Sequence, residues 1–413
     1  MDNSERVNST DIWYSRVIQN LSKEISLDEL ELLIPTTLKE ELPDMCSVTF
    51  ERNCNLQCLH CVYQEELSSW KYSVRSNLQE VIVNIVKQLS GKSKLLHEGR
   101  IITPRHIDIF REALNVRSDL SLGLIDNGTY TKYIRYFQSQ NVKLNWIDLS
   151  LDGTEQVHNK QRASDTAFAV VMNGLERAKE IVLPLSEGGK VNVPFTLTNI
   201  NFKDITNTAN LIFSSGLADG MDITTMSPAR LELEPYETSV AELAIAWEQI
   251  KAIFETYNKV DQKIYFRIYR HEDFEKLANV IGFQKFLNAL DNFSDDGDRV
   301  VSVEVGRITI SIDDTLITYS PLSIWPSETF IVDADGANRT AYSLKHTLEE
   351  LRAGKDKVGN DISHFTVTEL TSQTNYEETY SQGVDVWFNN LGKKYLHQEV
   401  EMMNRIRRNG KFS

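Results

Sequence analysis

The stretch "CSVTFERNCNLQCLHC", residues 46–61, contains all four cysteines of the 413-residue chain. Its first part is a short β-rich run, and its second part places Cys54, Cys58 and Cys61 in a C-x3-C-x2-C spacing directly after that run. In α/β barrels the loops that follow the strands carry the chemistry. The stretch therefore predicts a strand that leads into a thiol-rich loop at the functional end of a parallel sheet.

Short β-rich runs alternate with helical patterns from about Ser47 to Thr225, which is typical of βαβ units and a parallel sheet. The expected strands are Ser47–Glu51, Lys94–His97, Ser121–Ile125, Asn145–Leu151, Val191–Leu197 and Met221–Thr225. These βα units predict an α/β fold with a partial (β/α)6 TIM-like barrel.

After Thr225 the pattern changes to a long helix near Tyr236–Tyr257, followed by short strands between Val300 and Asp333 with Asp-Asp and Asp-Gly turns. This pattern predicts an α+β C-terminal domain. The expected division is an N-terminal helical segment over 1–45, the partial barrel over 46–230 and the α+β domain over 231–413.

Period-two alternation assigns the side chains of each strand to two faces. In "NWIDLSLDG", Ile147, Leu149 and Leu151 form the helix-facing set, and "VNVPFTLTN" repeats the pattern. The polar side chains assigned to the inner face are Thr49, Glu51, Asp148, Ser150, Asp152, Asn192, Thr196 and Thr198. An inner face this polar predicts a ligand site rather than a packed core, unless some of these strands are edge strands with one face in water.

The charge and the apolar pattern limit the class of protein. A formal net charge of −15 argues against a nucleic-acid partner or an anionic membrane surface, because both would repel the chain. No stretch of 18 apolar residues and no secretion signal is found. We therefore expect a cytoplasmic protein whose cysteines are reduced and serve as ligands.

Two metal sites are compatible with the cysteine loop. Three thiolates suit a [4Fe–4S] cluster in which one iron lacks a protein ligand. Zinc normally takes four ligands, and the neighbouring side chains of His60 and Cys61 could reach one metal only with strain. A structural zinc site remains the alternative.

The C-x3-C-x2-C loop after a first strand resembles that of the radical S-adenosylmethionine (SAM) enzymes. The segments "WIDLSLDGTEQVHNKQRA" (146–163) and "VPFTLTNINFKDI" (193–205) look like the fourth and fifth strand regions of its peptide-maturing subgroup. The resemblance implies that SAM binds the open iron and is cleaved reductively to a 5′-deoxyadenosyl radical, which takes a hydrogen atom from a substrate C–H bond. It also implies an external reductant of the flavodoxin or ferredoxin type.

The resemblance assigns roles to individual positions. Cys54, Cys58 and Cys61 would hold the cluster. The candidates for SAM binding are Glu98, Gly99, Asn127, Ser150, Arg162 and Thr196. Asp152 and His158 would face SAM or the substrate, or else serve turn and capping roles.

The segment "SPLSIWPSETFIVDADGANRTAYSLKHTLEELRAG" (320–354) resembles the skeleton of the SPASM extension that binds auxiliary clusters in relatives, but no cysteine follows Cys61. Without an auxiliary electron acceptor we expect a redox-neutral outcome such as epimerisation. Epimerases of the family quench the product radical with a thiol, for which Cys46 is the candidate. Cys46 shares its strand face with Val48 and Phe50, so burial against a helix is the competing interpretation.

Three functions follow from these observations. The first is a radical SAM enzyme that acts on a ribosomal precursor peptide. The second is a radical SAM epimerase, dehydratase or lyase for a small molecule such as an amino sugar or a nucleoside. The third is a non-catalytic metal-binding protein.

Overall fold

The structure is a computed structural model. It describes residues 26, 28–29, 45–48, 54–61, 77–89, 92–98, 101–226, 231–258, 262–291, 302–304, 307–319, 330–332, 353, 355, 359, 371, 373–387, 389 and 393–412.

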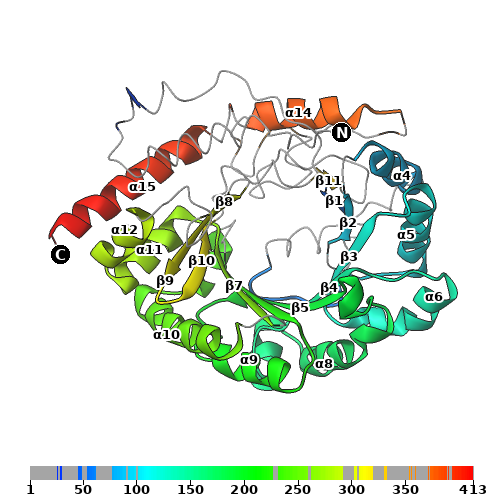
Figure 1. Ribbon diagram of the computed structural model, residues 1–413, viewed down its shortest axis with the longest axis horizontal. Helices are drawn as coiled ribbons and strands as arrows, with labels where there is room; N and C mark the ends of the chain where they lie inside the picture. Colours follow the sequence, from blue (N-terminus) through cyan, green and yellow to red (C-terminus); the bar gives the residue numbers. More distant parts are fainter. Residues whose placement is uncertain are drawn as a thin grey trace.

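One curved sheet of 11 strands organises the molecule (Figure 1), in the order β11-β1-β2-β3-β4-β5-β6-β7-β10-β9-β8. The strands are β1 (Met45–Val48), β2 (Lys94–His97), β3 (Ser121–Asp126), β4 (Trp146–Leu149), β5 (Lys190–Leu197), β6 (Gly220–Thr225), β7 (Lys263–Ile268), β8 (Ser302–Glu304), β9 (Arg307–Ile312), β10 (Thr315–Tyr319) and β11 (Phe330–Val332). The pairs from β11 to β10 are parallel, whereas β9 is antiparallel to both β10 and β8.

Helices line the outer side of this sheet and leave its inner side concave (Figure 1). They are α4 (Leu78–Gln88), α5 (Pro104–Val116), α6 (Ile134–Ser139), α7 (Glu155–Arg162), α8 (Ala167–Arg177), α9 (Ile205–Ser214), α10 (Val240–Tyr257), α11 (His271–Ile281), α12 (Phe283–Asp291), α14 (Tyr376–Trp387) and α15 (Lys393–Phe412). Near the C-terminus, α14 contacts α4 and α15 packs on α11 and α12. The last two helices therefore attach to opposite ends of the curved sheet.

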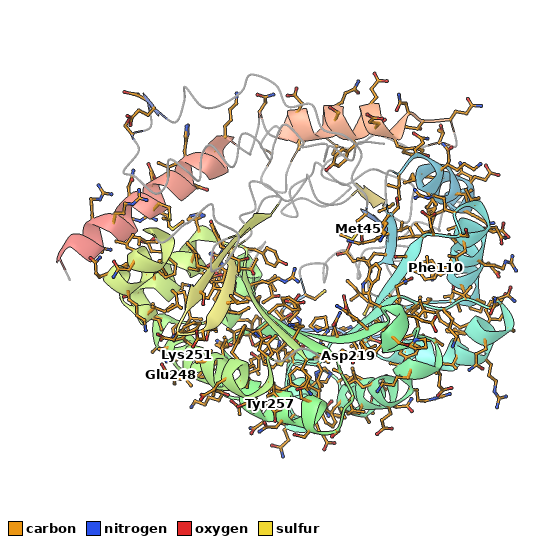
Figure 2. The ribbon with its side chains drawn as sticks, in the orientation of Figure 1. Met45, Phe110, Asp219, Glu248, Lys251 and Tyr257 are labelled. Carbon is orange, nitrogen blue, oxygen red and sulfur yellow. The ribbon has the colours of Figure 1, made fainter. Side chains whose placement is uncertain are left out.

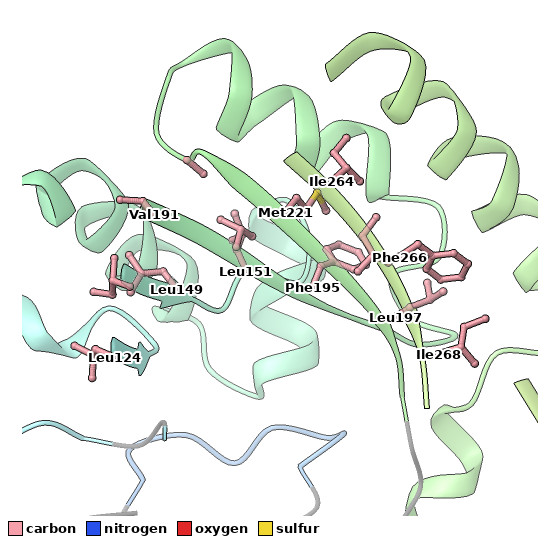
Figure 3. Close-up of a cluster of buried hydrophobic side chains, with 14 of the residues drawn as sticks. Leu124, Leu149, Leu151, Val191, Phe195, Leu197, Met221, Ile264, Phe266 and Ile268 are labelled. Carbon is pink, nitrogen blue, oxygen red and sulfur yellow. The ribbon is translucent and has the colours of Figure 1, made fainter. Parts of the chain in front are cut away.

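The core lies between the sheet and its outer helices. In β5 the apolar residues Val191, Val193, Phe195 and Leu197 are buried, while the residues between them are half-buried. Figure 3 shows the side chains of this layer from β3 to β7 gathered on the helix side. The period-two pattern read from the sequence is thus the pattern that divides the core face from the inner face.

The outer helices are fixed by local chemistry as well as by packing. The hydroxyl of Ser239 accepts from the Glu242 amide, and the Glu242 carboxylate accepts from the Ser239 amide, which forms a capping box at the start of α10. On the outer surface of α10, Lys251 pairs with Glu248 at 2.8 Å (Figure 2). The fully buried Phe110 of α5 belongs to the same core layer.

The predicted α/β fold with a partial barrel is confirmed. All six expected barrel strands form, and the first and last residues of each lie within three positions of those predicted. Strand β7 was missed, although its alternation of Ile264, Phe266 and Ile268 with polar or aromatic residues is visible in "KIYFRI". The short strands expected for a separate C-terminal domain form too, but β10 pairs with β7 and β11 pairs with β1. They extend both ends of the barrel sheet, and the division into three parts stays a prediction.

Some expectations fall outside the described residues. These are Gly99, the inner-face candidates Thr49 and Glu51, nearly all of the N-terminal segment 1–45, and the SPASM-like segment 320–354 apart from β11 and residue 353. Among the helices that the structure describes, none combines the length and the apolar character that crossing a membrane requires.

Candidate active site

The cysteine loop lies directly after β1, at the carboxyl end of the parallel strands. Cys58 is 7 % exposed, Cys54 and Cys61 are half-buried, and none of the three is in a disulfide. Cys58 forms a small apolar cluster with Leu56 and Ala167, and Cys54 and Cys61 pack against this cluster. The loop therefore gathers three thiols beside one shielded surface.

Two hydrogen bonds attach this loop to neighbouring elements. The Leu59 amide donates to the Gln161 carbonyl of α7 at 2.9 Å. Asn127, which directly follows β3, donates from Nδ2 to Oδ1 of Asn55 at 2.8 Å. Both ends of the cysteine motif are thus positioned by residues from outside the loop.

A buried ion pair lies next to the central cysteine. Nε of Arg162, the last residue of α7, is 2.6 Å from Oδ2 of Asp152, and Nη1 of Arg162 donates to Sγ of Cys58 at 3.6 Å. Asp152 is fully buried and Arg162 is 9 % exposed. The positive charge of Arg162 therefore stands between a carboxylate and a candidate cluster ligand.

The pKa values of these groups agree with a charged pair. Burial raises the pKa of Asp152, but Arg162, the neighbouring histidines and the Thr196 amide together outweigh it, so the pKa lies below its usual value. Burial raises the pKa of the Cys58 thiol to about 11, although Arg162 counteracts part of the rise. Binding to iron would remove this proton, because metal ligation requires the thiolate.

The two histidines of the site are neutral. Burial lowers the pKa of His60 to about 4 and that of His158 to about 3. Nδ1 of His158 accepts a hydrogen bond from the Asp152 amide at 3.0 Å. His158 thus holds the turn after β4, and its contact with SAM or substrate stays a prediction, as does that of Asp152.

The candidates for SAM binding lie at one edge of the sheet, where the parallel strands end. Glu98 follows β2, and its Oε2 accepts from the Ser47 hydroxyl at 3.0 Å. Ser150 follows β4, and its amide donates to the Asp126 carbonyl at 3.2 Å. In β5, the Thr196 amide donates to Oδ1 of Asp152 at 2.8 Å. The structure therefore brings Glu98, Asn127, Ser150, Arg162 and Thr196 to the edge that carries the cysteine loop.

Sequence reasoning missed a polar layer behind this edge. Nε2 of Gln161 donates to the Thr196 carbonyl at 3.0 Å, and Oε1 of Gln161 accepts from the Thr198 hydroxyl at 2.8 Å. Nδ2 of Asn201 donates to the carbonyls of Asp152 and Thr196. Gln161 lies beside Arg162 in the quoted fourth-strand segment, but periodicity gives no sign that a helical glutamine would reach β5.

Cys46 lies on the other side of β1. It is fully buried in the main apolar core together with Val48, and burial raises the pKa of its thiol. The expected burial is confirmed. This placement favours packing over the hydrogen-donor role that the sequence left open.

Asp148 and Asn192 lie on the inner face of the sheet as predicted, and Asp222 and Arg267 join them there. Nδ2 of Asn192 donates to Oδ1 of Asp148 at 3.0 Å, as their adjacent register positions allow. Nε of Arg267 lies 3.0 Å from Oδ2 of Asp222 across β6 and β7. The second pair was missed because β7 itself was not expected.

The donor set fits a cluster and a bound cofactor. Among the described residues, no three His, Cys, Asp or Glu side chains converge as one metal ion would need. A [4Fe–4S] cluster makes a different demand, because each thiolate binds its own iron. In the same part of the chain, Nδ1 of His60 and Oδ1 of Asn127 are buried without a hydrogen-bond partner. Both atoms lie in or beside the cysteine loop and could accept donors of a ligand such as SAM.

Comparisons with known proteins agree with this site. The model of the Radical SAM superfamily matches residues 48–212. Fe-coproporphyrin III synthase of Methanosarcina barkeri is 27% identical over 155 residues, which span 37% of this chain and 37% of that protein. The match thus covers little more than a third of that relative.

Solved structures agree on the fold. SuiB of Streptococcus suis bound to S-adenosylmethionine is 10% identical with a TM-score of 0.52, covering 90% of this chain and 75% of that one. SuiB bound to the precursor peptide SuiA gives 8% identity and a TM-score of 0.50 over 90% and 76%. The similarity to the Radical SAM superfamily thus covers residues 48–212, and the solved structures agree with it in fold alone. Enzymes of this superfamily use a [4Fe–4S] cluster and SAM, which the cysteine loop would bind here.

Proposed function

We propose that this chain, which carries a radical SAM domain over residues 48–212, uses a [4Fe–4S] cluster and SAM to take a hydrogen atom from a precursor peptide. The observation that carries the proposal is the cysteine loop itself. Three cysteines outside any disulfide follow β1 on one loop, with the guanidinium of Arg162 against the central one.

The cofactors would supply the radical, and the chain would supply position and shielding. Cys54, Cys58 and Cys61 would hold three irons of the cluster. Glu98 offers a carboxylate for the amino group of SAM, while His60 and Asn127 offer acceptors close to the loop. The inner face, with Ser150 and Thr196 at its edge, would hold the reacting substrate carbon next to the cofactor and away from water.

Arg162 has a different part from the one that the resemblance implied. Its Nε is engaged by Asp152 and its Nη1 faces Cys58. A hydrogen bond from a cation to a ligand sulfur stabilises negative charge on the cluster. We therefore assign Arg162 first to the cluster, and contact with the SAM carboxylate would use its second terminal nitrogen.

A peptide substrate is supported by the peptide-like fourth-strand segment and by a fold neighbour, SuiB, which has been seen with a precursor peptide. A redox-neutral outcome such as epimerisation is supported by the sequence, since no cysteine between residues 62 and 413 offers an auxiliary cluster. An external flavodoxin or ferredoxin would deliver the electron. The reduced thiols suit the cytoplasm.

A small-molecule substrate is the second candidate. The observation that favours it is the similarity to Fe-coproporphyrin III synthase, a relative named for a small-molecule product. The inner face, with its paired polar side chains, suits either class of substrate.

The first experiment tests the radical chemistry. Protein is reconstituted anaerobically with iron and sulfide, mixed with SAM and dithionite, and assayed for 5′-deoxyadenosine by mass spectrometry. We expect production by the wild type and none by Cys58→Ala. Cys46→Ala is the matched control and should keep the iron and sulfide content of the wild type. Zinc in place of iron, with no SAM cleavage, would instead support the non-catalytic metal-binding protein.

The second experiment separates the substrates. Candidate peptides and small molecules are screened for stimulation of 5′-deoxyadenosine formation, and products are examined after reaction in D2O. Epimerisation incorporates solvent deuterium without any other change in mass. A product that has lost two hydrogens would overturn the redox-neutral proposal and leave the radical chemistry intact.

A further inference from the structure

A row of polar side chains on the inner face lies deeper than the cofactor site. Asp148, Asn192, Asp222 and Arg267 come from the successive strands β4, β5, β6 and β7. Asp148 precedes Ser150 by two residues, which is about 7 Å along a strand. The row is therefore separate from the residues assigned to the cluster and SAM, and it lies within reach of a substrate held below them.

Two glycines make room for this part of the inner face. A Cβ atom on Gly123 of β3 would lie only 2.0 Å from the indole ring of Trp146, so the indole lies over the glycine. A Cβ atom on Gly220 of β6 would lie 2.7 Å from Oδ1 of Asn192. The indole of Trp146 thus lies over β3 and the amide of Asn192 reaches over β6, on either side of β4 and β5.

The charges of the row do not cancel. Arg267 pairs with Asp222, which leaves Asp148 as the carboxylate in excess. Within the described residues, the one hydrogen bond to the Asp148 carboxylate comes from the neutral amide of Asn192. Burial raises the pKa of Asp148 to about 7, Asp222 raises it further and Arg267 opposes them. Asp148 is half-buried, so its charge is only partly hydrated, and a ligand that brings a cation would stabilise it.

The surroundings of Asp148 are suited to a cation. Trp146 lies two residues earlier on the same face of β4, and its half-buried indole offers a π-face for a cation. The inner-face neighbours of Asp148 on the adjacent strands are the uncharged Ile125 and Asn192. The cation on β5 is Lys190, which pairs in register with Trp146, is exposed and, among the described residues, forms no ion pair with Asp148.

The same face continues into apolar surface. Tyr265 of β7 is paired in register with Asp222, and Leu316 of β10 comes next along the row. Each of these two side chains is 40% exposed. Exposed apolar side chains beside a half-buried charge are expected where a ligand with both apolar and charged groups binds.

We infer that the inner face at β4 and β5 binds a cationic group of the substrate, an ammonium or a guanidinium, with Asp148 as its counter-ion and Trp146 as its aromatic partner. The inference rests on the proposed function, because the group belongs to the substrate of that enzyme. A lysine or arginine side chain of a peptide and an amino sugar share this chemistry.

Binding of small probes tests this site without requiring catalysis. Equilibrium dialysis of the reconstituted protein with SAM is carried out with Nα-acetyl-lysine methylamide and with its Nε-acetylated, uncharged counterpart. The second pair is 6-amino-6-deoxyglucose, whose amine is largely protonated at pH 8, and its N-acetyl derivative, so that the arms distinguish a peptide side chain from an amino sugar. We expect the charged member of at least one pair to bind at least tenfold more tightly at pH 8.

The pH dependence identifies the counter-ion. If binding needs the ionised carboxylate, affinity for the charged probe falls about tenfold from pH 8 to pH 6, because the ionised fraction falls by that factor around a pKa of about 7. Asp148→Asn keeps the side-chain shape and should bind at the reduced level at both pH values. The control Asp119→Asn changes a carboxylate that is 64% exposed and should behave as the wild type.

Equal binding of charged and acetylated probes, no binding of either amine, or an unchanged pH dependence in Asp148→Asn would each overturn the inference. These results do not depend on SAM cleavage. A protein that binds the amines and makes no 5′-deoxyadenosine would keep the cation site and lose the proposed function. The reverse result would keep the function and remove the cation site.

Discussion

Arg162 donates to Asp152 over 2.6 Å while its other end faces a candidate iron ligand, Cys58, at 3.6 Å. The carboxylate comes from the turn after β4 and the guanidinium from the end of α7, ten residues later in the sequence. The ion pair thus joins the two ends of segment 152–162 and holds the positive charge of Arg162 next to the cysteine loop. Arginine suits this place because its charge persists when buried and its nitrogens point in several directions.

The first prediction concerns the reduction potential of the cluster. Replacing Arg162 by methionine removes a positive charge and a donor beside Cys58, so the reduced, more negative cluster loses stabilisation. A difference of about 1 kcal/mol between the two oxidation states corresponds to about 40 mV for one electron. The midpoint potential, measured by an anaerobic titration followed by electron paramagnetic resonance, should therefore fall by about that amount.

Arg162→Lys is the matched control for that measurement, because it keeps the charge and changes the geometry. Its potential should lie between those of the wild type and Arg162→Met. A potential that is the same in all three proteins, at equal iron content, would show that Arg162 does not act on the cluster.

The second prediction concerns the stability of the ion pair. Asp152→Ala leaves the guanidinium of Arg162 buried without its carboxylate, which should lower the free energy of unfolding by about 4 kcal/mol. Arg162→Met should cost a similar amount, and the double variant should cost much less than the sum. Urea unfolding of the four proteins measures the coupling. Additive losses would mean that the two residues stabilise the fold independently.

The strand pattern made most of the fold predictable. In β4 and β5 every second residue is apolar, which predicts that one face of these strands belongs to the core. Ile147, Phe195 and Leu197 on that face are buried as expected. The cysteine spacing identified the metal loop because three ligands lie within eight residues. Both signals are local, and local signals survive in a single sequence.

The parts that sequence could not supply depend on contacts between distant residues. Gln161 and Thr198 are 37 positions apart, and Asp222 meets Arg267 only because β7 joins β6. The C-terminal strands were expected, but nothing local states that β10 would pair with β7 or β11 with β1. The resemblance gave Arg162 a role at SAM, and the structure adds Asp152 and Cys58 as its immediate partners.

The third prediction concerns the pH dependence of stability at Asp148. In the folded protein its pKa is raised to about 7, whereas in the unfolded chain it is about 3.9. Between these values the folded state keeps the proton that the unfolded state has lost, so stability falls as pH rises and levels off above pH 7. Asp148→Asn lacks this loss.

The measurement compares free energies of unfolding of wild type and Asp148→Asn at pH 6 and pH 8. The wild type should lose about 1 kcal/mol more than the variant over this interval, since one pKa unit corresponds to about 1.4 kcal/mol. Parallel changes in the two proteins would mean that Asp148 has an ordinary pKa. That result would also remove the electrostatic basis of the cation site.

The last prediction tests the layer that positions the site. Phe195 is fully buried on the helix side of β5, while the residue after it, Thr196, contributes its amide and carbonyl to the polar layer. Truncating Phe195 to alanine opens a cavity and should lower the free energy of unfolding by about 3–5 kcal/mol. Because β5 is then less firmly held, the Thr196 amide should also exchange its hydrogen faster in hydrogen-exchange mass spectrometry.

Leu185→Ala, at a side chain that is 52% exposed, is the control and should change stability by less than about 0.5 kcal/mol. Loss of stability without faster exchange at Thr196 would mean that the polar layer, rather than the core packing beneath it, holds this edge of the sheet.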